Sequence, residues 1–424
     1  MKKKFLFLLH LIVVTVGVSA QTESNNYKMG INKFIEFYNV GAADSIFNMF
    51  NAKMQQALLL EKTRQIVAQL KYQVGDIKTT ELTTIKNEIA SYKTTFTNGV
   101  FAIKIGFDTE NKITMLLVQP YQEEKINIID SSLSEATVNL NTIGASLSGS
   151  LITPKNFTGK IPVVLIIAGS GATDRDGNSG GLVSGNSYFL LAQALGKTGI
   201  AALRYDKRTV GKSKTIQTEA ELRFNDFVND ATAFIKQLKS DPRFSKVFVL
   251  GHSEGSLIGM ISCEKINANG YISLAGLGEP AYKTLAVQLK NQFPENDKIT
   301  VTRLDSLRKN QMVNAEATDI IFRPSLQPYL ISWFKYNPAL EIKKLKIPVL
   351  IINGTTDIQV SVRDAEILKK AKPDASLVLI NNMNHVLKDA PADRDKNLAT
   401  YNNPLLPISA NLISTIVKFV NHLK

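Results

Sequence analysis

The chain has 424 residues but only one cysteine, Cys263, and only four histidines. A single cysteine excludes an intramolecular disulfide. No group of His, Asp and Glu has the spacing of metal ligands, and no glycine-rich nucleotide motif is present, so we expect neither a metal nor a cofactor. Stability must therefore come from packed hydrophobic cores.

Basic charge is in excess but is not concentrated in one place. Lysine and arginine total 50 against 37 acidic residues, a formal net charge of +13, and they are spread along the chain. The densest run, Glu341–Lys346, is typical of a short amphipathic connection, and aromatic residues are not interleaved with basic clusters. We therefore expect no nucleic-acid partner.

One long apolar run lies at the start of the chain. Lys2, Lys3 and Lys4 precede the apolar residues Phe5–Val18, and small residues end the run at Ala20. This order predicts a cleaved signal peptide over residues 1–20 rather than a buried first helix. No cysteine follows directly for a lipid anchor, and no later run is long enough to cross a membrane. We expect a secreted or periplasmic protein without an integral membrane segment after cleavage.

Residues 26–121 are expected to form a small α+β domain. Apolar residues at helical spacing around Phe34 and Met54 come first, and segments of strand-like composition follow after Gly75. These strands are predicted at Thr79–Thr84, Glu88–Phe96, Val100–Phe107 and Lys112–Gln119. The domain has no His and no Cys, which favours a spacer or a binding module. A polar linker over residues 122–135 is predicted to follow it.

Residues 136–424 alternate between strand and helix patterns. Near-continuous runs of Val, Ile and Leu, such as Pro162–Ala168, are typical of strands buried on both faces. They predict a mostly parallel sheet flanked by helices, opened by an antiparallel hairpin that includes Gly144–Ile152. Cys263 is expected to be a buried packing residue.

The strand pattern stops between about residues 278 and 346. Helical segments are predicted there at Leu285–Leu289, Ile299–Leu307 and Asn314–Phe322, and we expect the interval to form a helical lid over the active site. Its aromatic residues are expected either to wall an apolar acyl pocket or to pack the lid onto the body. These residues are Tyr282, Phe293, Phe322, Tyr329, Trp333, Phe334 and Tyr336.

A nucleophile motif lies in the middle of this region. Gly251–Gly255 reads Gly-His-Ser-Glu-Gly and fits the G-x-S-x-G elbow, in which a serine occupies a strained turn between a strand and a helix. A second match, Gly177–Gly181, has no strand directly before it. Ser253 follows the apolar segment Val247–Leu250, so its context selects it as the nucleophile.

The general base follows by elimination. His10 lies in the predicted signal peptide, and His422 lies within three residues of the C-terminus. His252 adjoins the nucleophile, where the turn should point its ring away from the hydroxyl. His385 remains, in a polar loop just after an apolar strand, and is the predicted base.

The third member of the set should be an acid after the preceding strand. Asp357 has that position, with Asp364 and Asp389 as the next candidates. The order Ser253, Asp357, His385 is that of the α/β-hydrolase triad.

An oxyanion hole should combine two backbone N–H groups. One is expected from Glu254, directly after the nucleophile, and the other from Gly169–Gly171, the loop after the strand Pro162–Ala168. We assign the second donor to Ser170, with Gly169 as the near alternative.

These motifs, together with Asp174–Asn178 and Arg204–Arg208, resemble a secreted bacterial carboxylesterase family often labelled serine aminopeptidase-like (S33). The resemblance runs from about Val138 to the C-terminus and implies an α/β-hydrolase fold with the triad on the residues named above. Thr209 stands where such chains usually carry glycine, which puts the geometry of that turn in doubt. The N-terminal region resembles a small domain of unknown function often found ahead of such hydrolases.

The expected function is that of a carboxylesterase, acting on small esters with short or medium acyl groups through an acyl-enzyme on Ser253. A serine aminopeptidase would share the triad and need an acid for the substrate amine, such as Glu279, Glu295 or Glu316. An inert cell-surface binding protein is the third alternative. Residues Asp174 to Asp176 are expected either to line the site or to form a salt-bridged brace.

Overall fold

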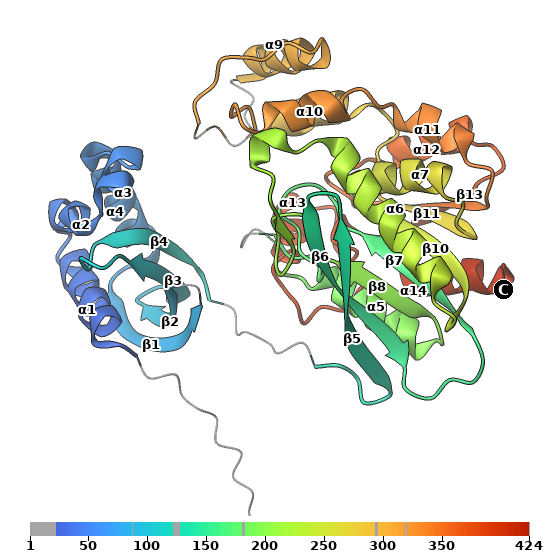
Figure 1. Ribbon diagram of the computed structural model, residues 1–424. Helices are drawn as coiled ribbons and strands as arrows, with labels where there is room; N and C mark the ends of the chain where they lie inside the picture. Colours follow the sequence, from blue (N-terminus) through green and yellow to red (C-terminus); the bar gives the residue numbers. More distant parts are fainter. Residues whose placement is uncertain are drawn as a thin grey trace, which may run out of the picture. The chain divides into compact units, whose positions relative to one another are not determined.

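The structure is a computed structural model that describes residues 23–86, 88–121, 128–179, 183–292, 296–317, 319 and 321–423. The predicted signal peptide and most of the first half of the predicted linker lie outside these ranges. The chain divides into two compact units between Glu124 and Lys125, both drawn in Figure 1. Each unit is described by itself.

The described residues of the first unit form four helices and a four-stranded antiparallel sheet. The strands pair in chain order, where their composition predicts them. The elements are α1 (Asn25–Asn39), α2 (Ala43–Met49), α3 (Ala52–Ala57), α4 (Leu60–Val74), β1 (Ile77–Lys86), β2 (Ile89–Phe96), β3 (Gly99–Phe107) and β4 (Ile113–Pro120).

One face of this sheet carries the core of the first unit. Along β2 every second residue is buried, including Tyr92 and Phe96, as expected for a strand covered on one face. Phe34 and Tyr38 of α1 belong to the same buried cluster. The unit is therefore a helix-on-sheet domain with its own core.

The second unit is built on a sheet of nine strands in the described part of the chain. Its order is β13-β12-β11-β10-β7-β8-β6-β5, with β9 paired to β6. The pairs from β8 to β13 are parallel, whereas β5, β6 and β9 join antiparallel. The strands are β5 (Leu133–Thr142), β6 (Ala145–Pro154), β7 (Ile161–Ile167), β8 (Ala201–Tyr205), β9 (Lys214–Thr215), β10 (Phe244–His252), β11 (Gly270–Leu274), β12 (Val349–Gly354) and β13 (Ser376–Ile380).

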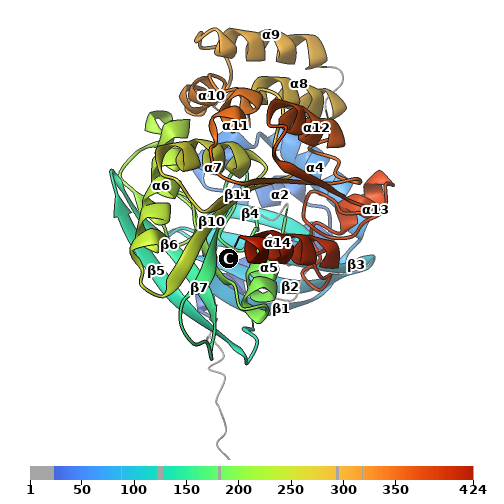
Figure 2. The same cartoon turned by 90° about the vertical axis from the view of Figure 1, so that its right-hand side faces the viewer.

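Helices cover both faces of this sheet. Along β7, Val163 and Leu165 belong to one buried cluster while Val164 and Ile166 belong to another. The first cluster contains residues of α6 (Phe224–Ser240), α7 (Glu254–Lys265) and α12 (Val362–Ala371), and the second contains residues of α5 (Ser187–Lys197) and α14 (Ala410–His422). Figure 2 shows α5 beside α14, and α6 beside α7. Burial on both faces explains why these strands read as continuous apolar runs.

The interval predicted as a lid is helical, and the segments Leu285–Leu289 and Ile299–Leu307 both fall within helices, as predicted. It holds α8 (Ala281–Gln292), α9 (Asp297–Arg308), α10 (Gln327–Trp333) and α11 (Pro338–Lys344), which gather at the top of Figure 2. Two short elements lie elsewhere, the 3₁₀ turn Glu219–Glu221 and α13 (Arg394–Ala399).

The prediction of a helix over Asn314–Phe322 is wrong. Its described residues are irregular, because Asp319 Oδ1 accepts the N–H groups of Ile321 and Phe322 and so closes a local turn. Gln327 holds the preceding loop by hydrogen bonds to both backbone groups of Val313.

Candidate active site

Ser253 occupies a strained turn between β10 and α7. Its backbone has φ 55° and ψ −121°, a conformation that side-chain-bearing residues rarely adopt. A Cβ at Gly251 would lie 2.1 Å from the Gly255 carbonyl oxygen, and one at Gly255 would lie 2.3 Å from that of Ile167. Both glycines are therefore needed for the backbone to pass so closely, which is the physical basis of the G-x-S-x-G pattern.

His385 and Asp357 meet at the same edge of the sheet. His385 Nδ1 lies 2.8 Å from Asp357 Oδ2, and the two side chains are 7% and 1% exposed. The other carboxylate oxygen, Oδ1, accepts the N–H groups of Gln359 and Val360 at 2.8 and 2.9 Å. A carboxylate only accepts, so Nδ1 carries the proton and Nε2 is left as the basic nitrogen.

Buried amides tie the Asp357 and His385 loops together. Asn384, next to His385, donates to the side chains of Asn397 and Thr400. Asn397 in turn donates to the carbonyl of Thr356, next to Asp357. These bonds fix the His385 ring relative to the acid without using either functional group.

A cavity of about 200 Å³ joins the nucleophile and the base. Ser253 and His385 both line it. Ser253 Oγ has no hydrogen-bond partner among the described residues. The wall of the cavity also contains Gly169 and Ser170 of the expected oxyanion loop, whereas Glu254 lines a second cavity of about 180 Å³. The lining residues are Gly169, Ser170, Thr173, Gly177, Ser179, Val183, Ser187, Tyr188, His252, Ser253, Gln359, His385, Val386 and Leu387.

The second histidine of the site, His252, has both ring nitrogens engaged. Nδ1 lies 2.7 Å from the Tyr188 hydroxyl and Nε2 lies 2.9 Å from the His385 carbonyl oxygen. Burial, with a smaller contribution from His385, lowers the pKa of His252 well below its usual range. His252 is therefore occupied as a structural link.

The hydrogen bonds of the oxyanion loop differ between its two candidate donors, the N–H groups of Gly169 and Ser170. The Gly169 N–H donates to the Tyr188 hydroxyl at 3.2 Å. The Ser170 N–H has no acceptor among the described residues, and Ser170 lines the cavity. The N–H of Glu254 begins α7, where the first amides of a helix have no acceptor within the helix.

Residues Asp174 to Asp176 form a brace. Arg175 is ion-paired with Asp206 at 2.6 Å, and Asp176 with Arg204 at 2.8 Å. None of the three lines the cavity beside Ser253 as described.

Thr209, the departure from the usual glycine, has φ 68°. A β-branched residue is strained at positive φ, so the chain keeps the glycine-type turn at an energetic cost.

The second serine motif does not form an elbow in its described part. Ser179 lines the cavity, but its N–H pairs with the Val183 carbonyl in a loop, away from any strand-to-helix junction. Gly180 and Gly181 lie outside the described residues.

Two of the lid aromatics pack the lid onto the body, and a third lines a cavity. Trp333 and Phe334 are buried in the main core, and Trp333 stacks on Phe224 of α6. Tyr329 lines a neighbouring cavity of about 180 Å³, which also touches Glu254. Among the described lid aromatics none lines the cavity at Ser253 itself. Phe293 lies outside the described residues.

The lid acids do not face the described site. Glu279 is paired with Lys283 at 2.8 Å, and Glu316 is exposed and away from the Ser253 cavity. Glu295 lies outside the described residues.

Sequence reasoning missed Tyr188 and Lys207. Tyr188 binds both His252 and Gly169, and the buried Lys207 Nζ donates to the Gly169 carbonyl. Lys207 could have been found from its position directly before Arg208, in the segment Arg204–Arg208 on which the resemblance partly rests.

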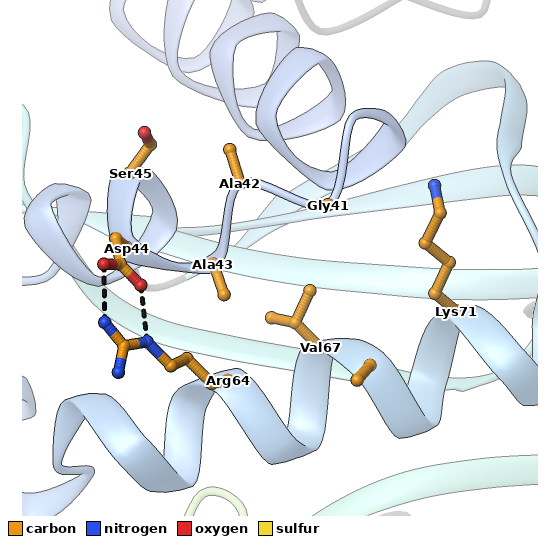
Figure 3. Close-up of a pocket in the computed structure, with 9 residues that line it drawn as sticks. Gly41, Ala42, Ala43, Asp44, Ser45, Arg64, Val67 and Lys71 are labelled. Atoms are coloured by element: carbon orange, nitrogen blue, oxygen red, sulfur yellow. Dashed lines mark hydrogen bonds and ion pairs between the residues drawn. The ribbon is translucent and has the colours of Figure 1, made fainter.

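A wide cavity of about 500 Å³ lies on the first unit, between the loop at Gly41 and α4. Figure 3 shows Asp44 and Arg64 facing each other there, 2.7 Å apart in a two-bond ion pair. Lys71, on the same helix, points elsewhere and pairs with Asp76. These charges are mutually satisfied and include no nucleophile with a base.

Two features are absent from the described residues. These residues contain no group of three or more His, Cys, Asp or Glu side chains placed to hold a metal ion. They also contain no helix with the length and apolar character needed to span a bilayer.

The strand order, the elbow at Ser253 and a family match decide the class of the second unit. Residues 178–327 match the family described as "Serine aminopeptidase, S33". The second unit has the α/β-hydrolase fold. Residues 32–116 match a "Protein of unknown function (DUF3887)", so the chain combines this hydrolase with the small domain suggested by the resemblance.

Similar proteins include esterases. Esterase EstD of Thermotoga maritima is 26% identical over 363 residues, which cover 81% of this chain and 84% of EstD. Among solved structures, Est1E from Butyrivibrio proteoclasticus with bound ferulic acid is 17% identical, covering 67% of this chain and 99% of Est1E, with a TM-score of 0.46. The Pyrococcus furiosus esterase Pf2001 is 19% identical, with 69% and 93% covered and a TM-score of 0.43. The S33 match and the EstD relative support an esterase-type hydrolase.

Proposed function

We propose that the chain is a carboxylesterase that cleaves small esters with short or medium acyl groups. Ser253 attacks the ester carbonyl, His385 Nε2 takes its proton, and Asp357 holds the imidazole in the required tautomer. The N–H groups of Ser170 and Glu254 stabilise the tetrahedral oxyanion. The alcohol leaves with a proton from His385, and water then hydrolyses the acyl-enzyme by the same route.

One observation carries this proposal. The His385–Asp357 pair is 2.8 Å apart and almost fully buried, and it opens onto the same small cavity as a serine held at φ 55°. A buried, oriented imidazole beside a strained serine supports nucleophilic catalysis more directly than a binding role. The cavity of about 200 Å³ suits a short acyl chain.

The peptidase alternative lacks support at the described acids. A substrate amine needs an unpaired carboxylate near the nucleophile, whereas Glu254 beside Ser253 is already close to Lys207, at 3.8 Å. The lid acids that are described lie away from the Ser253 cavity.

Covalent labelling and substrate comparison test the proposal. A fluorophosphonate should label Ser253 stoichiometrically, and p-nitrophenyl acetate or butyrate should be hydrolysed much faster than aminoacyl p-nitroanilides at equal concentration. Preference for the anilides would favour the aminopeptidase. Absence of labelling in the folded protein would favour an inert binding protein.

We also propose that the chain is exported and loses residues 1–20. Intact mass and N-terminal sequencing of the protein from its native envelope or medium should place the first residue at Gln21. A chain that keeps Met1 in the cytoplasm would contradict this proposal.

A further inference from the structure

Two successive peptide groups of the oxyanion loop form hydrogen bonds with side chains that lie outside the loop. The peptide between Ala168 and Gly169 presents its N–H to the Tyr188 hydroxyl at 3.2 Å. The next peptide, between Gly169 and Ser170, presents its carbonyl to the buried ammonium of Lys207. The carbonyl that Lys207 holds and the N–H of Ser170 therefore belong to one peptide plane.

That shared plane fixes where the Ser170 N–H points. In a trans peptide the C=O and the N–H lie on opposite sides of the chain, and the plane is rigid. A cation on the carbonyl side consequently turns the N–H to the other side. Gly169 lies against the nucleophile, since a Cβ placed on it would be 3.2 Å from Ser253 Cβ, and Ser170 lines the cavity.

Lys207 is itself held in place. Its side chain is 5% exposed, and Glu254 Oε1 lies 3.8 Å from Nζ with a side chain that is 2% exposed. Tyr329 of α10 lines the same small cavity as Lys207 and Glu254. Burial lowers the pKa of Lys207 and raises that of Glu254, yet in either protonation state Nζ keeps N–H groups to donate.

The Tyr188 side of the loop has only one consistent arrangement of protons. The His385 carbonyl can only accept, so His252 Nε2 carries hydrogen. The low pKa of His252 keeps the ring neutral, so Nδ1 accepts the Tyr188 proton. The tyrosine oxygen is then free to accept the Gly169 N–H, which matches the observed contact.

We propose that Lys207 and Tyr188 are positioning residues that orient the Gly169–Ser170 peptides and so present the Ser170 N–H to the oxyanion. This inference rests on the proposed esterase function. Neither side chain needs to touch the substrate. Without them the loop peptide can rotate, and a carbonyl turned into the oxyanion hole would repel the developing negative charge.

A buried lysine stabilises a packed core less than an apolar side chain does. An isolated ammonium in the interior is strongly disfavoured, so an apolar side chain would stabilise this position better if packing were its only role. Lys207 Nζ lies where its N–H groups reach one backbone carbonyl, that of Gly169. A role in orienting that carbonyl accounts for both its burial and its contacts.

Tyr188→Phe and the double variant Lys207→Met/Glu254→Gln test the inference in the full chain. The double variant removes the buried charge pair together but keeps the Glu254 backbone N–H. The readouts are kcat, KM and the inhibition constant of a trifluoromethyl ketone, whose serine adduct carries a real oxyanion. Tyr205→Phe is the matched control, because Tyr205 is a buried core tyrosine packed on Phe234.

Both test variants should lose about ten- to a hundredfold in kcat, since removal of a whole oxyanion donor costs about 10² to 10³. The trifluoromethyl ketone should bind more weakly by a similar factor while KM stays nearly constant, and Tyr205→Phe should match the wild type. Folded variants with wild-type kcat and inhibitor affinity would overturn the inference, as would a loss confined to KM. If the double variant does not fold, Tyr188→Phe, which keeps the ring, decides alone.

Failure of the function itself would look different. A wild-type chain that neither hydrolyses esters nor binds the ketone would refute the proposed esterase. A wild-type chain that does both, and is inactivated by Ser253→Ala but not by the test variants, would refute only the positioning role.

Discussion

The two units of the chain treat charge in opposite ways. In the first unit the Asp44–Arg64 pair is about half exposed, and the buried polar side chains of its described part, tyrosines aside, are two threonines. In the second unit Arg208 and Asp230 are paired at 1% exposure each. Strain at Ser253 and Thr209 also lies in the second unit.

The second unit therefore contains features that lower stability but fix the geometry of particular groups. Buried ion pairs seldom add stability over apolar packing, and strained backbone costs energy. Ser253 lines the cavity of about 200 Å³, and Arg208 and Thr209 line the neighbouring cavity of about 180 Å³, whereas the first unit is a helix-on-sheet core with a charged surface. The contrast favours the second unit as the place of the proposed chemistry, and the following experiments test it.

Ser253→Ala should have the largest effect. Loss of the nucleophile of a triad costs on the order of 10⁶ in kcat, and fluorophosphonate labelling should disappear while the circular dichroism spectrum is kept. Ser179→Ala is the matched control, because Ser179 lines the same cavity from the other motif. If Ser179→Ala inactivated the protein and Ser253→Ala did not, the nucleophile would be Ser179.

Asp357→Asn should rank second. The amide would support the wrong histidine tautomer, and kcat should fall by roughly 10⁴ with folding intact. Asp389→Asn, at an exposed position of the His385 loop, is the control and should be close to wild type. A nearly active Asp357→Asn would mean that the acid comes from elsewhere.

Lys388→Met should change how the free energy of unfolding depends on pH, because Lys388 is a buried titratable group. Burial lowers the pKa of Lys388 to about 8, whereas lysine in an unfolded chain titrates near 10.4. Between these values the unfolded chain binds the proton and the folded chain does not, so wild-type stability should rise with pH relative to the variant. The slope is at most about 1.4 kcal/mol per pH unit, and it vanishes below pH 8.

Denaturant melts of both proteins between pH 7 and 10 give this difference in free energy of unfolding. Parallel stability curves across that range would show that Lys388 titrates normally.

Removal of the first unit should have a small effect. A chain that begins at Ile128 keeps the bonds of Asp130 to Gln193 and Lys197, which anchor the start of the second unit. It should fold and hydrolyse p-nitrophenyl acetate with unchanged kcat/KM. A folded but inactive product would show that the first unit completes the site.

Cys263 should show the smallest effect of all. It is 1% exposed on α7, and burial raises the pKa of its thiol. A thiol reagent should therefore not modify the native protein on the timescale on which it modifies the unfolded chain. Rapid native labelling would mean that α7 opens.

Local patterns carried much of the fold. Strands such as β7 and β10 are buried on both faces and read as apolar runs, and the Ser253 turn is encoded within five consecutive residues. The helix expected over Asn314–Phe322 failed because one side chain, Asp319, captured two backbone N–H groups that a helix would have used.

The class of fold and the candidates Ser253, Asp357 and His385 could be predicted from the sequence, because each residue follows a recognisable strand and the chain has few histidines. Tertiary structure decided which oxyanion amide is free, where the lid aromatics pack and what His252 binds. Those outcomes depend on contacts between distant segments: Lys207 reaches Gly169 across 38 positions, and His252 reaches His385 across 133. No local pattern encodes such contacts, since they exist only once the sheet has brought the loops to one edge.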